Sequence, residues 1–224
     1  EHEQSHTLHL RGLEERIARL IEAMQGSLKF EEFERVRRTA LSCQIAWNET
    51  FGEVTDISNL RVQRNLFRYR PARCLIRFSQ DARGDELGQV LVAAQAARAP
   101  MMISTAWELP TGLARELEYQ NASVRVESDE EFLQRMRAEG LRDCPRLRLL
   151  GGSRSALMSA LRNAVDIAVF SDDVTLAGRV EMLPFLREQT ISITAHRFGE
   201  VDERVLELFP HETIVDPDAS LLGR

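Results

Sequence analysis

The chain has 224 residues, a length that suits one domain with an appendage or two small domains. Hydrophobic residues make up 43% and charged residues 29%, which supplies a core and excludes a disordered chain. The net charge of -6 provides no overall basic field, so nucleic-acid binding is disfavoured as the main task. No apolar stretch of the sequence approaches the length of a membrane span.

The N-terminal part of the chain predicts two helices. Residues 11–25 place their apolar side chains on one stripe, and Gly26-Ser27 interrupts the pattern. A longer helix is expected from about Phe30 to Phe51. The two form an antiparallel hairpin that is too small to bury both apolar faces alone, so we expect it to pack on another part of the chain. Residues 52–70 have an irregular, polar pattern.

After Pro71, short apolar runs alternate with helical segments, which predicts a parallel sheet with helices on both faces and right-handed crossovers. Residues 166–170 are the clearest buried strand. The predicted class is therefore α/β, a Rossmann-like parallel sheet preceded by the helical hairpin. Expected domains are residues 1–70, 71–199 and a tail, 200–224. Strands are expected at 74–78, 101–103, 123–126, 147–150, 166–170 and 190–194, and helices at 85–98, 110–119, from 128, at 154–162 and at 179–187.

Gly151-Gly152-Ser153 is the best site in the sequence. It joins a predicted strand end to a helix start, where free N–H groups and the helix dipole can hold a phosphate. The full G-x-G-x-x-G pattern is absent, and a tight turn with Ser153 as the helix N-cap explains the same residues. We therefore expect no catalytic, cofactor or metal site, with these three residues as weak candidates for a nucleotide.

The three cysteines, Cys43, Cys74 and Cys144, are far apart and have no C-x-x-C spacing. This pattern disfavours a disulfide framework or a zinc site and fits a reducing cytoplasm. Cys43 lies on a helix stripe and Cys74 within a predicted strand, positions that are typical of buried, inert thiols. Asp172-Asp173 follows the strand at 166–170 on its carboxyl side, where α/β sheets bind ligands, and its role stays open.

Histidines are the other residues that could bind a metal. His2, His6 and His9 are spaced so that one helical face could gather them, although a solvated tail is the default explanation. His196 and His211 stand alone in the sequence, which favours surface or hydrogen-bonding roles over catalysis.

Three segments resemble a known family. They are Phe67–Pro71 (FRYRP), Trp107–Pro110 (WELP), and Gly178–Gln189 continuing through Ile191–Gly199. Together they are similar to the C-terminal region of long bifunctional proline-utilization A flavoenzymes of the actinobacterial kind, over roughly residues 30–199. Such proteins join an FAD-dependent proline dehydrogenase to an NAD-dependent glutamate-semialdehyde dehydrogenase. The longer ones carry a further C-terminal domain that looks like an aldehyde dehydrogenase coenzyme-binding domain without its active site.

The sequence departs from a working aldehyde dehydrogenase. It contains neither a Cys after a Gly-Gln pair nor the string Glu-Leu-Gly-Gly, and Ile103–Ala106 has no lysine for the adenosine ribose. The resemblance thus implies a non-catalytic domain that packs on the catalytic aldehyde dehydrogenase domain of the same protein and covers the intermediate's path. The strand at Ile191–Thr194 and the tail through Leu222 are the expected contact. NAD and FAD are expected only in the parent enzyme, which we expect to be a cytoplasmic homo-oligomer.

Two other functions stay open. Gly151-Gly152-Ser153 would suit a functional NAD-binding dehydrogenase domain, and the apolar stripes of the N-terminal hairpin would suit a stand-alone dimeric interaction protein. The polar start of the chain has no initiator Met and is unlike a signal peptide, so we expect a processed chain or a segment of a larger protein. No role is assigned to residues 1–28 or 200–224.

Overall fold

The computed structural model describes residues 10–56, 58, 60, 63–141, 144–194, 196, 197, 200, 201, 214 and 215. The chain divides into two compact units. One unit contains the N-terminal helices up to residue 45 together with residues 71–185, and the other contains residues 46–70 with the chain from 186 onward.

A parallel sheet of five strands forms the centre of the first unit, and their spatial order is β5-β4-β3-β6-β7. Numbered along the chain, this is the order 3-2-1-4-5 of a dinucleotide fold, whose direction of winding reverses between β3 and β6. The predicted class is confirmed. The strands are β3 (Cys74–Phe78), β4 (Met101–Thr105), β5 (Ser123–Val126), β6 (Arg146–Leu150) and β7 (Ala168–Phe170).

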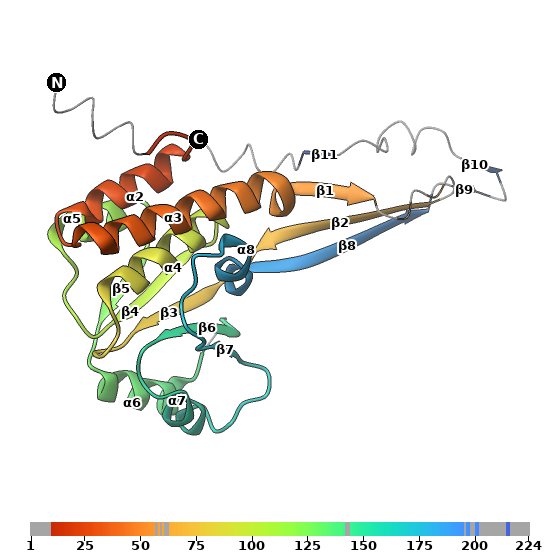
Figure 1. The fold of residues 1–224 in the computed structure, drawn as a ribbon. Coiled ribbons are helices and arrows are strands. Elements are labelled where there is room, and N and C mark those ends of the chain that lie inside the picture. The colour runs from red at the N-terminus through yellow and green to blue at the C-terminus, as the bar shows by residue number, and fades with distance from the viewer. Residues whose placement is uncertain are drawn as a thin grey trace. The chain divides into compact units, whose positions relative to one another are not determined.

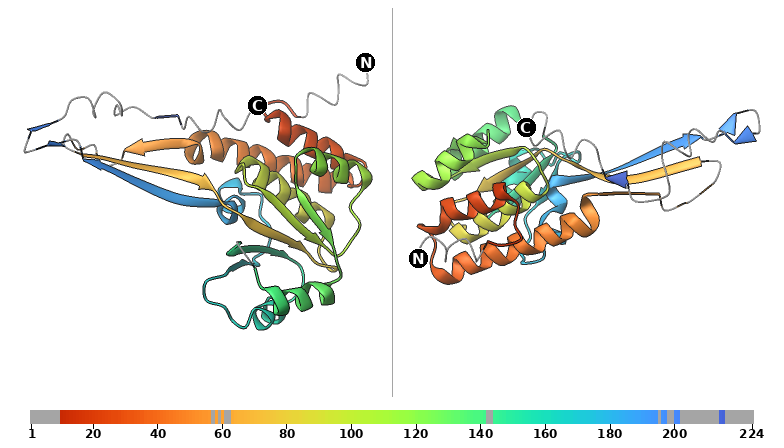
Figure 2. Two further views of the ribbon diagram at one scale, coloured as in Figure 1. Left: turned by 180° about the vertical axis from the view of Figure 1, so that it is seen from behind. Right: turned by 90° about the horizontal axis from the view of Figure 1, so that it is seen from above.

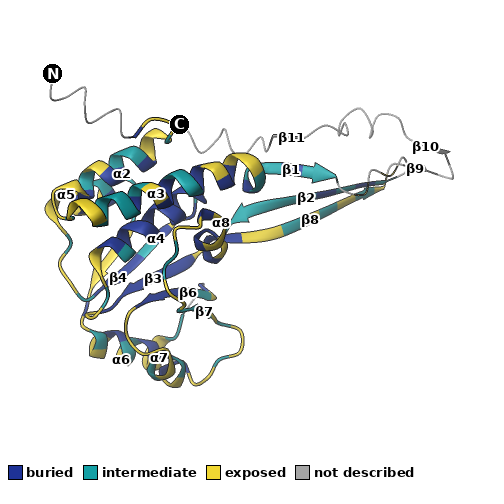
Figure 3. Cartoon of the chain, in the orientation of Figure 1, coloured by how far each residue is buried: buried dark blue, intermediate teal, exposed yellow. Residues whose placement is uncertain are grey.

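Helices cover both faces of this sheet (Figure 1 and Figure 2). On one side, α6 (Asp129–Glu139) and α7 (Arg154–Ala160) pack over Leu75, Leu147 and Leu149. The opposite side carries α4 (Gly84–Ala96) and α5 (Thr111–Tyr119). Figure 3 shows the result, with β3 and β6 buried between the two layers. Their near-continuous burial explains why apolar runs predicted these strands.

The N-terminal hairpin consists of α2 (Glu15–Gln25) and α3 (Phe30–Ala46), which continues into a π-helical turn, η1 (Trp47–Phe51). The helices are antiparallel, since the backbone N–H of Glu14 donates to the side-chain oxygen of Gln44 at 3.1 Å. As expected, the hairpin packs on the rest of the unit. The apolar stripe of α2 is buried where this helix packs on α4 and α5, and α3 contacts α4 through Thr39 and Gln89, 2.8 Å apart.

The segment after β7 differs from the expected helix over 179–187. Helix α8 (Gly178–Glu181) is short, and the 3-10 turn η2 (Leu183–Phe185) holds Pro184, so a continuous helix here is wrong. The strand expected at 166–170 is also shorter than predicted and is not the most buried. Among the described strands it pairs with β6 alone, and Ala168 is exposed at the edge of the sheet.

The second unit contains strands that, apart from part of β8, the sequence pattern did not predict. They are β1 (Glu53–Asp56), β2 (Gln63–Pro71), β8 (Leu186–Thr194) and β11 (Ile214–Val215), in the order β11-β1-β2-β8, with a separate pair β9 (His196–Arg197) and β10 (Glu200–Val201). The prediction of an irregular segment at 52–70 is therefore wrong, because these residues include β1 and most of β2. The expected strand at 190–194 exists within β8, but it belongs to this sheet and not to the parallel one. No helix among the described residues is both long and apolar enough to cross a membrane.

Candidate functional site

The loop Gly151-Gly152-Ser153 lies where the sequence placed it, between the carboxyl end of β6 and the start of α7. Its neighbour is the loop that follows β3, because β3 and β6 flank the point at which the sheet reverses its winding. Gly151 and Gly152 both have positive φ angles, 66° and 68°. The N-cap interpretation of Ser153 is confirmed, since its hydroxyl accepts the backbone N–H of Ala156 at 3.2 Å.

The N–H group of Gly152 is already occupied. It donates to the carboxylate of Asp81, in the loop after β3, at 2.7 Å. A Cβ on Gly151 would collide with the same carboxylate, and one on Gly152 would lie 2.7 Å from the hydroxyl of Ser79. Close packing between two loops of this chain therefore explains both glycines. A phosphate could use the Gly152 N–H only by displacing Asp81.

The start of α4 is the second place where a dinucleotide fold holds pyrophosphate. Here the first turn carries Asp85 and Glu86. Glu86 accepts the backbone N–H of Arg83 at 3.1 Å, so a carboxylate already caps the helix. Asp85 has a fully buried side chain that lies 2.6 Å from Arg35 and 3.1 Å from Arg83.

The pKa of Asp85 shows which effect dominates at this helix start. Burial alone raises the pKa, but the hydrogen bonds from Arg35 and Arg83 outweigh it and the net shift is downward. Asp85 is therefore ionised at neutral pH. Arg35 and Arg83 balance the charge of Asp85, and Arg83 also lies 3.6 Å from Glu86, so the ion pairs at this helix start are closed among the chain's own residues.

A buried ion network occupies the end of β4, where the family resemblance implies a ribose-binding lysine in an active enzyme. Ser104 stands in this stretch and is fully buried; its hydroxyl accepts from Arg77 at 2.7 Å and donates to Glu127 at 2.6 Å. Arg77 also donates to the carboxylate of Asp129 at 2.6 Å. Glu127 in turn pairs with Arg135. The Ser104 hydroxyl and the carboxylates of Glu127 and Asp129 are therefore engaged within the chain, and Arg77 Nε is the one nitrogen of this network that is buried without a hydrogen-bond partner.

A second buried pair holds the loop after β7. Arg148, in β6, lies 3.2 Å from Glu181, and their side chains are 4% and 3% exposed. Arg148 also donates to the backbone oxygen of Asp172 at 2.8 Å. The side chains of Asp172 and Asp173 themselves are exposed. The contact with Arg148 thus involves the backbone of this acidic pair, while the two carboxylates remain exposed at the surface.

All three cysteines are free and buried, which their sequence positions had indicated for Cys43 and Cys74. The pKa of Cys43 is raised to about 12 by burial first and by Glu181 second. The pKa of Cys74 is raised to about 12 by burial and then by Cys144. Neither is a thiolate at neutral pH, so neither is prepared for nucleophilic attack.

The metal hypothesis for the histidines falls outside the described structure. His2, His6, His9 and His211 are not described, and only the backbone of His196 is. Within the described residues, no group of three or more metal-ligating side chains occurs.

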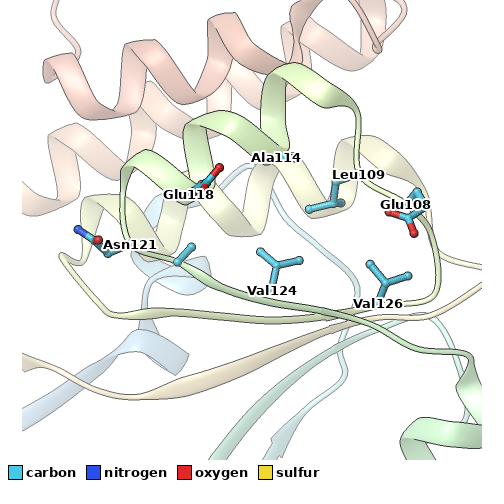
Figure 4. A pocket seen from close by; sticks show the side chains of 8 residues that line it. Glu108, Leu109, Ala114, Glu118, Asn121, Val124 and Val126 are labelled. Atoms are coloured by element: carbon cyan, nitrogen blue, oxygen red, sulfur yellow. The ribbon is translucent and has the colours of Figure 1, made fainter.

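A separate hollow of about 510 Å³ lies between α5 and β5, at residues that no sequence motif had indicated. Its floor is apolar and two glutamates stand along it (Figure 4). The lining residues are Glu108, Leu109, Ala114, Glu118, Asn121, Ala122, Val124 and Val126. Its members come from α5, from β5 and from the segments before and after α5, which no short sequence motif would connect.

No family model matches the sequence, and no curated protein matches it either. Among solved structures, the chain is similar to proline utilization A (PutA) from Corynebacterium freiburgense, with 23% sequence identity and a TM-score of 0.49. The similarity covers 80% of this chain and 15% of that protein. The chain thus spans about a seventh of the length of the protein it resembles.

Proposed function

We propose that this chain is a non-catalytic assembly domain of a bifunctional proline-catabolic oxidoreductase, in which other domains oxidise proline and glutamate semialdehyde with FAD and NAD. The observation that carries the proposal is the Asp81 carboxylate on the Gly152 N–H at the switch point. A dinucleotide-type sheet is present, but its anion-binding positions hold the chain's own acidic side chains. The FRYRP, WELP and 178–199 segments supply the link to proline catabolism.

The chemistry of the described residues supports a non-catalytic role. An aldehyde dehydrogenase needs a thiolate that attacks the carbonyl and a base that activates water for deacylation. Cys43 and Cys74 are buried with pKa values raised to about 12, so neither supplies the thiolate. The sequence also lacks the family's string for the general base. A role in assembly requires none of these groups.

The proposed contact with the catalytic domain uses the second unit. Among the described strands, β8 ends its sheet, and no strand pairs with its outer side. The burial of β8 alternates between exposed and intermediate over Glu188–Thr194, which is the pattern of a strand with one accessible face. An open strand edge of this kind can extend a neighbouring sheet by backbone hydrogen bonds. The homo-oligomer expected for the parent enzyme would present several such edges.

A calorimetric titration of the chain with NAD tests the first half of the proposal. We expect no saturable binding up to millimolar coenzyme. Micromolar binding that is abolished by Gly152→Trp would refute the non-catalytic assignment and restore the dehydrogenase alternative.

Loss of the β8 edge in the full-length protein tests the second half. Ile191→Pro removes a backbone N–H and should disturb strand addition, whereas Ile191→Val is the matched control. We expect the proline variant to lower coupled conversion of proline to glutamate, or to change oligomer size, while proline oxidation alone is unchanged. Unaltered coupling and unaltered size, in a variant whose circular dichroism matches wild type, would contradict the assembly role.

The apolar stripes of the N-terminal hairpin no longer favour the alternative of a stand-alone dimeric protein. The apolar stripe of α2, which includes Ile17, Leu20 and Ile21, is buried within the chain, and so are Val36 and Ala40 of α3. The hairpin therefore packs on its own unit, and these residues offer no free apolar face to a partner.

A further inference from the structure

The edge of the parallel sheet at β5 is unusually open. All four residues of β5 are exposed, whereas all five of β3 are buried. Val124 and Val126 keep 40% and 46% of their surface accessible. Proteins commonly protect such edges with charge, proline or a covering segment, because an open edge pairs readily with another strand. No strand within the described part of the chain covers this one.

The backbone N–H groups of Val124 and Val126 point toward the open edge of the sheet. Glu127 donates its N–H to the oxygen of Thr105 in the neighbouring stretch of chain, which fixes the direction of the peptide groups in β5. Since consecutive N–H groups along a strand point to alternate sides, those of Val124 and Val126 point away from β4. The same two residues therefore offer free backbone donors outward and apolar side chains to the floor of the α5–β5 hollow.

The charged side chains that line the hollow indicate which kind of ligand could bind there. Glu108 and Glu118 line the hollow, and neither forms an ion pair with any described residue. Figure 4 shows both along the helical side of the apolar floor that Val124 and Val126 provide. The nearest basic residue in β5 is Arg125, which does not line the hollow because alternate residues of a strand face opposite sides.

We propose that the α5–β5 hollow binds an extended peptide segment that adds to the β5 edge and carries arginine or lysine on the side facing the hollow. Its backbone bonds to the outward groups of Val124 and Val126. Every second side chain then faces the floor, so an apolar side chain rests on the valines while basic side chains reach Glu108 and Glu118. A second copy of β5 fits poorly, because it offers valines without a cation on that side. The site is independent of the proposed contact through β8.

The test uses the full chain and a capped heptapeptide, Thr-Arg-Thr-Val-Thr-Arg-Thr, titrated by calorimetry and by amide chemical shifts. The matched control peptide has glutamate in place of both arginines. We expect saturable binding of the arginine peptide alone, with shifts centred on residues 123–126. Glu108→Gln and Glu118→Gln should each weaken it about two- to five-fold, as for exposed ion pairs. Glu139→Gln, on α6, should leave it unchanged.

Three results would overturn the proposal. One is equal binding of the arginine and glutamate peptides. Another is unchanged affinity in the Glu108→Gln/Glu118→Gln double variant. The third is equally tight binding of free butylguanidinium, which would mean that the hollow takes a small cation and that strand pairing is not involved.

Discussion

The buried pair Arg148–Glu181 allows a quantitative test of the packing between β6 and the segment that follows β7. Arg148 stands in β6, next to the central strand β3, and Glu181 ends the short helix α8. Their side chains are almost fully buried and 3.2 Å apart. Glu181 also accepts the backbone N–H of Thr175 at 2.7 Å. The pair therefore connects the sheet to the segment that follows β7.

Glu181→Gln removes the charge and keeps an oxygen that can accept from Thr175. It leaves the Arg148 guanidinium buried without a counter-charge, which costs about 3–5 kcal/mol in comparable buried pairs. Against a total stability of about 5–15 kcal/mol for a domain, this loss is large. Arg148→Met should be at least as destabilising, because the oxygen of Asp172 then loses its donor as well.

Urea unfolding, followed by circular dichroism, measures the change. Glu139→Gln is the matched control, since Glu139 is exposed at the end of α6 and its replacement should alter the free energy of unfolding by less than about 0.5 kcal/mol. The double variant Arg148→Met/Glu181→Gln should lose less than the sum of the two single losses. A loss below about 0.5 kcal/mol for Glu181→Gln would refute the reasoning that an ionised carboxylate stabilises this core.

Three further outcomes follow from the structure. Gly178→Ala should lower the free energy of unfolding by about 1–3 kcal/mol, because its Cβ would collide with the backbone of α3 at Cys43. Gly26→Ala meets no atom within 4 Å and should be neutral or stabilising. Thermal denaturation measures both changes. The difference in unfolding free energy between wild type and Asp85→Asn should be constant near neutral pH and shrink as the pH falls below the ordinary value of 3.8, since the lowered pKa in the folded state makes this contribution disappear on protonation. Ellman's reagent at pH 8 should label neither Cys43 nor Cys74 in the native chain and both after denaturation; rapid native labelling would contradict their raised pKa values.

Local patterns were sufficient for the parallel sheet. In a βαβ unit each strand pairs with one nearby in sequence, and burial on both faces produces apolar runs that can be recognised without knowing the partners. The second unit lacks this advantage. Strand β2 is rich in polar side chains, and its neighbour β8 lies far along the sequence, as the contact between Arg68 and Gln189 at 2.8 Å illustrates. Only the pairing makes the segment a strand.

The candidate site shows the same division. The position of Gly151-Gly152 at a strand end followed from the strand-helix alternation. The residue that occupies this site could not be predicted from the sequence, because Asp81 comes from a loop 71 residues earlier and carries no motif of its own. Arg77 could have been noticed, since a charged residue inside an apolar strand requires a buried partner. Its partner Asp129 lay among acidic residues that helix capping already explained.

The ion pairs at the carboxyl edge of the sheet also set the cost of any coenzyme binding. A dinucleotide would have to displace Asp81 from Gly152 and place its pyrophosphate close to that carboxylate. Two unit charges 4 Å apart repel by about 4 kcal/mol near a protein surface, and every 1.4 kcal/mol is about ten-fold in affinity. Removing Asp81 alone would free one N–H group but leave the start of α4 capped by Glu86 and closed by the ion pairs of Asp85. We therefore expect that Asp81→Gly does not create NAD binding. Binding by this single variant would mean that Asp81 alone keeps the coenzyme out.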